Sequence, residues 1–185
     1  MMKKMMMIAA MMLMSMGAFA QNEVGQFTLQ PKVGINISKI TGEGLKTTVG
    51  LVAGVEAEYG VAESFGITAG LLYSMQGYKA EGADKRSGMD YINIPILAQY
   101  YVVKGLAIKA GVQPGFLVRA KYDGNSFSDQ CKKVDFSIPV GLSYEYQSFV
   151  LDARYNIGLT KTYKDAAEKT KNSVFQITVG YKFAL

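Results

Sequence analysis

Hydrophobic and polar residues alternate at every second position along almost the whole chain after residue 21. Alternation with a period of two is the signature of β-strands that have two unlike faces. Polar connections separate the alternating segments, so the pattern predicts an all-β protein of eight strands. The predicted strands cover residues 27–38, 48–59, 65–77, 92–102, 106–118, 134–146, 149–159 and 175–185.

One face of these segments is apolar or aromatic throughout. Its 51 positions hold no charged residue, amide, serine or threonine, although the 19% charge content of the chain would place about ten charges there. The opposite face is polar and carries ten glycines, which suits a crowded interior. Apolar outside and polar inside predicts a transmembrane β-barrel. The equal numbers of basic and acidic residues on the polar face predict a neutral, salt-bridged lumen. These charged residues are Lys32, Lys109, Arg119, Arg154, Lys182, Glu56, Glu58, Asp135, Glu145 and Asp152.

The dimensions fit a bilayer. Strands of roughly 13 residues at about 3.3 Å per residue, tilted by about 40°, rise roughly 30 Å and cross an apolar band of roughly 25 Å. Every backbone group in lipid needs a partner, so the strands are expected to close into an eight-stranded antiparallel up-and-down barrel.

The connections alternate in length. Longer polar segments cover 39–46, 79–89, 120–133 and 161–172, and short turns lie near 60–64, 103–105 and 147–148. In outer-membrane barrels the long loops face outward and the short turns face the periplasm. Aromatic girdles are then expected at both rims. The outer girdle is Tyr73, Phe116, Phe136, Tyr155 and Phe175, and the periplasmic girdle is Phe27, Tyr59, Phe65, Tyr100, Tyr144, Tyr146, Phe149, Tyr181 and Phe183.

All four prolines lie inside predicted strands, where each removes a backbone donor from the ladder. Bulges, or a lumenal side chain or water bonded to the orphaned carbonyl, are expected at Pro31, Pro95, Pro114 and Pro139.

The first twenty residues have a different pattern. Lys3 and Lys4 precede an apolar run rich in methionine, and Ala-Phe-Ala stands before Gln21. This arrangement is typical of a cleaved secretory signal peptide. The run is shorter than the roughly 20 residues of a membrane-spanning helix. We therefore expect a signal peptide over 1–20 and a β-barrel domain over 21–185.

The composition excludes much chemistry. The chain has no histidine and a single cysteine, Cys131. It therefore has no imidazole for a catalytic triad or metal site, and no internal disulfide. Glu56 and Glu58 would both face the lumen about 7 Å apart. A pair of carboxylates acting as in a retaining glycosidase is therefore possible in principle. Salt bridges with Lys32, Arg154 or Lys182 are the favoured interpretation, because side chains fill an eight-stranded lumen.

We accordingly predict no enzyme, no cofactor and no catalytic, cofactor-binding or metal site. The lumen is expected to be filled further by six large inward side chains. These are Leu72, Tyr78, Tyr91, Leu97, Tyr101 and Leu117.

The longer loops carry the excess of positive charge. Their net charges are +1, +1, +1 and +2, against +3 for residues 21–185. Basic loops beside the phosphates of lipopolysaccharide would anchor a barrel in the outer leaflet. An ordinary solvated loop surface explains the same charges equally well.

Three segments resemble the PorT-type outer-membrane β-barrel family. They are Pro-Lys-Val-Gly-Ile-Asn over 31–36, Tyr-Ile-Asn-Ile-Pro-Ile-Leu over 91–97 and Val-Gly-Tyr-Lys-Phe over 179–183. The resemblance implies an eight-stranded barrel in the outer membrane of a Gram-negative cell, similar to the small OmpX and OmpA-type barrels. It also implies the barrel-assembly machinery as a partner during biogenesis, and it carries over no functional residues.

The main hypothesis is a structural or interaction protein with a closed lumen. Its loops would contact outer-membrane lipids, lipopolysaccharide or a protein partner, and no nucleic acid is expected to bind. A narrow porin-like channel for small solutes is the first alternative. A soluble periplasmic lipocalin-like binding barrel is the second.

Overall fold

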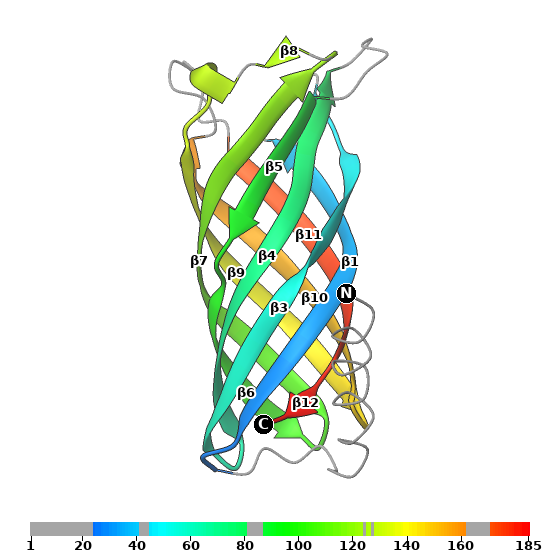
Figure 1. Ribbon diagram of the computed structural model, residues 1–185, viewed down its shortest axis with the longest axis vertical. Coiled ribbons are helices and arrows are strands. Elements are labelled where there is room, and N and C mark those ends of the chain that lie inside the picture. Colours follow the sequence, from blue (N-terminus) through cyan, green and yellow to red (C-terminus); the bar gives the residue numbers. More distant parts are fainter. Residues whose placement is uncertain (1–23, 41–44, 81–86, 124, 127, 162–170) are drawn as a thin grey trace, which may run out of the picture.

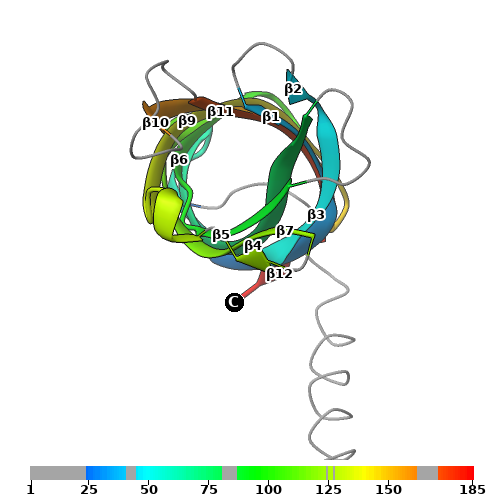
Figure 2. The same cartoon turned by 90° about the horizontal axis from the view of Figure 1, so that it is seen from above.

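A computed structural model describes residues 24–40, 45–80, 87–123, 125–126, 128–161 and 171–185. The chain forms a closed antiparallel barrel, seen along its wall in Figure 1 and down its axis in Figure 2. Each strand pairs with the next along the chain, and β1 (Phe27–Ile40) closes the ring by pairing with β11 (Lys171–Tyr181). The predicted signal peptide over 1–20 lies outside the described residues.

Eight wall positions make up the ring. Two of them are divided: the fourth consists of β5 and β6, and the eighth of β11 and β12 (Phe183–Ala184). The other elements are β3 (Thr48–Ala62), β4 (Phe65–Ala80), β5 (Ser87–Asn93), β6 (Ile96–Val103), β7 (Leu106–Tyr122), β9 (Val134–Tyr146) and β10 (Phe149–Lys161). Short pieces β2 (Leu45–Lys46), β8 (Asn125–Ser126) and a 3₁₀ turn, η1 (Ser128–Gln130), lie at one end.

Burial alternates along the strands as the sequence predicts. In β3 every second residue from Val49 to Val55 is exposed, while Thr48, Val52 and Glu56 are buried. Apolar side chains therefore face outward and polar ones inward. A lipocalin-like soluble barrel requires the opposite arrangement, so that alternative is wrong. Among the described residues, no helix is long and apolar enough to cross a membrane.

The two ends of the barrel differ. Strands β1, β4, β7 and β10 run toward one end, called here the long-loop end. The turns near 63–64, 104–105 and 147–148 lie at the other, the short-turn end. Gly105 and Gln147 take positive φ values of 83° and 56° in two of these turns. All five residues of the predicted outer girdle are exposed on the wall.

The four prolines lie at or beside breaks in the hydrogen-bond ladders between strands, and the barrel stays closed around them. Pro31 lies where the partner of β1 changes from β12 to β11, and Pro139 lies opposite a gap in the β7–β9 ladder. Pro95 falls between β5 and β6, so the predicted strand over 92–102 is divided there. Pro114 lies beside this break and its carbonyl accepts a hydrogen bond from Ile94. The missing donors thus coincide with places where a ladder is already open.

Candidate functional site

The lumen holds a cluster of charged side chains in the half of the barrel nearer the short-turn end. We call Lys32, Glu56, Lys109, Asp152 and Arg154 the central ion layer. The five come from β1, β3, β7 and β10, and all are almost completely buried. They face inward because each occupies the polar phase of its strand.

Arg154 connects the two carboxylates of this layer. Its Nη1 donates to Glu56 Oε1 at 2.7 Å, and its Nη2 and Nε donate to the two oxygens of Asp152 at 2.7 Å each. Glu56 lies on β3, on the opposite wall from β10, so the guanidinium bridges the lumen. Lys32 Nζ lies 2.8 Å from Glu56 Oε2, and Lys109 Nζ lies 3.1 Å from Asp152 Oδ2.

Two inward-facing glycines leave room for this layer. A Cβ on Gly70 would lie 2.5 Å from the Cγ of Glu56, and a Cβ on Gly141 would lie 2.7 Å from the Cβ of Arg154. The missing side chains on the polar face are therefore a packing requirement of the charged ones.

A second group of ions lies toward the short-turn end. Lys182 Nζ is 2.8 Å from Glu58 Oε2 and 2.5 Å from Glu145 Oε1. The Tyr101 hydroxyl lies 2.8 Å from Glu58 Oε1 and 2.6 Å from Glu145 Oε1, so it donates to one carboxylate at a time. Gln99 Nε2 donates to Glu58 as well.

Glu56 and Glu58 both form salt bridges inside the barrel. Glu56 pairs with Lys32 and Arg154, and Glu58 pairs with Lys182. Both carboxylates are thus held by cations inside the barrel. Among the described residues, no three Asp, Glu, Cys or His side chains gather to hold a metal ion.

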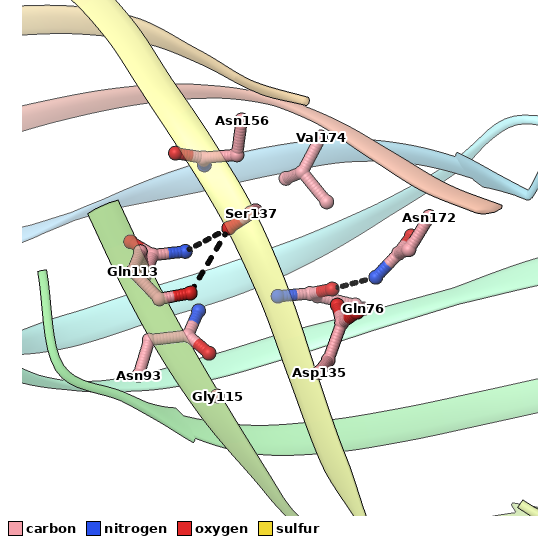
Figure 3. A pocket seen from close by; sticks show the side chains of 9 residues that line it. All are labelled: Gln76, Asn93, Gln113, Gly115, Asp135, Ser137, Asn156, Asn172 and Val174. Carbon is pink, nitrogen blue, oxygen red and sulfur yellow. Dashed lines mark hydrogen bonds between the residues drawn. The ribbon is translucent and has the colours of Figure 1, made fainter. Parts of the chain in front are cut away.

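An amide-rich pocket lies between the central ion layer and the long-loop end (Figure 3). Gln113 Nε2 donates to Ser137 Oγ at 3.2 Å, and Asn172 donates to Gln76. Both polar atoms of Asn156 and the Nδ2 of Asn93 have no partner among the described protein groups. The cavity is about 10 Å³, enough for about one water molecule. The pocket suits water, which would satisfy these buried amides.

Above this pocket an apolar cluster covers part of the lumen. Cys131 is buried against Met89, Tyr91 and Ala120, and Tyr78 and Leu117 pack against the group. Leu72 and Leu97 are also buried inside the barrel, as predicted.

One charged residue of the predicted lumenal set, Arg119, departs from the prediction. Arg119, expected in the lumen, has a side chain that is 50% exposed, and it pairs with Asp90 on the outward face. An extra residue, Val118, enters β7 opposite Asp90 and Tyr91 and shifts the phase. Of the ten charged residues predicted to face the lumen, four basic and five acidic ones remain there. Asp90 lies between the predicted loop over 79–89 and the predicted strand over 92–102. It shares the phase of Ile92, and this phase would have placed it on the outward face.

The sequence matches a family profile described as the outer membrane protein beta-barrel domain over residues 19–164. No curated protein matches it.

Several solved structures have the same fold. The attachment invasion locus protein Ail of Yersinia pestis is 15% identical with a TM-score of 0.55, covering 87% of this chain and 100% of its own. Neisserial surface protein A is 14% identical with a TM-score of 0.58, covering 85% and 97%. OprG of Pseudomonas aeruginosa is 14% identical with a TM-score of 0.53, covering 90% and 99%. At these identities the similarity shows the fold alone.

Proposed function

Because the chain belongs to the outer membrane protein β-barrel family, we propose that it is a non-catalytic interaction protein with a closed lumen. Its long-loop end would face outside the cell and contact lipopolysaccharide. The observation that carries this proposal is the pairing of a filled, ion-bridged lumen with basic residues at the long-loop end.

The packing of the lumen supports closure. Arg154 on β10 bridges to Glu56 on β3, and Leu72 and Leu97 are fully buried inside the barrel. Opening a path would break several charge-assisted hydrogen bonds, each worth about 1.5–3 kcal/mol. An eight-stranded barrel is also just wide enough for side chains to fill.

The charge at the long-loop end supports the choice of ligand. Basic side chains outnumber acidic ones among the exposed described residues there. The basic ones are Lys39, Lys46, Arg119, Lys121, Lys132 and Lys133, and the acidic ones are Asp123 and Asp129. Such an excess attracts the phosphates of lipopolysaccharide. Ail of Yersinia pestis, one of the structural neighbours, has been crystallised with the heparin analogue sucrose octasulfate, which is likewise a polyanionic carbohydrate.

A narrow channel for small solutes is the second candidate. The amide-rich pocket favours a channel, because buried amides without a protein partner, such as that of Asn156, need water inside the barrel to bond to. The central ion layer and the group around Lys182 would then have to open between the pocket and the short-turn end.

The route to the membrane is part of the proposal. A signal peptide over 1–20 would direct export, and the barrel-assembly machinery would insert the domain over 21–185. Membership in the PorT-type group, suggested by the three sequence segments, belongs to the same proposal.

Stability in defined membranes tests the ligand. A ligand that binds only the folded state raises its stability. Refolded protein should resist urea better in vesicles with lipopolysaccharide than in phospholipid alone, and the gain should shrink at high salt. Equal urea midpoints in both membranes would contradict the proposed contact.

A further inference from the structure

An ion pair lies on the outward face of the barrel near the long-loop end. Asp90 points outward between Gly88 and Ile92, yet its side chain is only 3% exposed. Arg119 Nε donates to Asp90 Oδ2 at 2.7 Å, Arg119 Nη2 lies 2.5 Å from the same oxygen, and the Tyr73 hydroxyl donates to it at 2.6 Å. A buried carboxylate on this wall therefore fixes the position of a guanidinium.

The bulge in β7 explains why Arg119 faces outward. Register shifts by one residue where Asp90 and Tyr91 pair with Arg119 and Leu117. Bulges re-aim side chains in this way. Asp90 engages two of the five N–H donors of the guanidinium, and half of the Arg119 side chain remains exposed. Three N–H donors of the guanidinium remain beyond the two that bind Asp90.

A second cation and a flat piece of wall adjoin Arg119. Lys121 is exposed two residues further along β7 and pairs with Gly88. A Cβ on Gly88 would meet only the Lys121 carbonyl oxygen, at 3.9 Å, so the wall in front of this row is open. Gly88 in turn pairs with Gly77. A group as large as a phosphate can approach both cations here.

The position of Arg119 and Lys121 relative to the outer aromatic girdle indicates which kind of ligand they would meet. Arg119 lies three residues beyond Phe116, a rise of roughly 7–8 Å along a tilted strand. That places it beyond the hydrocarbon, at the level of the lipid headgroups. Phosphate is the headgroup chemistry that an arginine fork and a lysine recognise.

We propose that Arg119 and Lys121 form a site for the phosphate of an outer-leaflet lipid, with Asp90 and Tyr73 as positioning residues. The site rests on the proposed function in one respect, namely that the long-loop end lies in the outer leaflet. It deepens that function by moving the main lipid contact from the loops to the wall.

The test compares two double variants that remove equal charge. Arg119→Gln with Lys121→Gln changes the wall, and Lys132→Gln with Lys133→Gln changes an exposed loop at the same end. Native mass spectrometry would count molecules of bisphosphorylated lipid A bound to detergent-refolded protein. Lys121→Gln alone, at an exposed position, guards against a folding defect from the loss of Arg119.

The wall variant should bind lipid A at least about tenfold more weakly, Lys121→Gln should also weaken binding, and the loop variant should change little. Lipid A without phosphates should bind poorly to the unsubstituted protein, and inorganic phosphate should not displace the bisphosphorylated form. Equal losses in both double variants, or displacement by inorganic phosphate, would overturn the wall site. If the unsubstituted protein is stabilised by lipopolysaccharide while the wall variant binds normally, only this inference fails. No stabilisation of any variant would remove the proposed function as well.

Discussion

Replacing Arg154 with methionine is the most informative perturbation of the lumen. The side chain is 1% exposed and donates four hydrogen bonds of 2.7–3.2 Å to Glu56 and Asp152. At about 1.5–3 kcal/mol for each bond to a charged group, simple addition would give roughly 6–12 kcal/mol. That sum overstates the loss, because such bonds are not additive and other cations remain.

The remaining cations set the expected value. Lys32 still lies 2.8 Å from Glu56 and 3.5 Å from Asp152, and Lys109 lies 3.1 Å from Asp152. The layer changes from three cations and two anions to two of each, so no carboxylate is left without a cation. Removing one partner of a buried ion pair typically costs about 3–5 kcal/mol, and we expect the lower part of that range.

The assay is urea unfolding in lipid vesicles, followed by far-ultraviolet circular dichroism because the chain has no tryptophan. Lys104→Ala, at an exposed position in a short turn, is the control and should change stability by less than about 1 kcal/mol. Arg154→Met combined with Glu56→Gln keeps the net charge of the layer at +1 and should recover part of the loss. An Arg154→Met protein as stable as the Lys104 control would refute the reasoning that the layer holds opposite walls together.

Three further predictions concern packing. Val140→Lys, on the outward face of β9, should cost about 2–4 kcal/mol in the same unfolding assay, and a neutral result would mean that Val140 does not face the middle of the bilayer. Gly141→Ala should cost about 1–3 kcal/mol, because its Cβ would lie 2.4 Å from the Ala153 oxygen, whereas Gly88→Ala should be tolerated. Cys131 should react with a maleimide only after unfolding, since it is fully buried, and fast labelling of the folded barrel would contradict the apolar cluster.

The wall of the barrel was predictable because its physics is local. A strand with lipid on one side and a polar lumen on the other must alternate, so parity alone assigns each side chain to a face. The predicted strand over 134–146 has the same bounds as β9. The predicted strand over 92–102 is divided in the structure, because Pro95 lies between β5 and β6. The alternation of polar and apolar residues continues through this break and so does not reveal it.

The lumen was predictable in part. Parity placed Lys32, Glu56 and Arg154 inside, and the structure pairs them. The contact between Lys109 and Asp152 was not foreseen, because β7 and β10 are not neighbours and their contact depends on the stagger of the whole ring. Arg119 was misplaced because a bulge adds a residue to one strand only, and its position depends on pairing between strands.

Single-channel recording in planar lipid bilayers tests the central claim most directly. On the proposal that the ion layers and the inward leucines close the lumen, purified refolded protein should give no reproducible conductance steps. Reproducible unitary steps that disappear when the protein is heat-denatured before addition would contradict the closed lumen and establish the narrow channel instead.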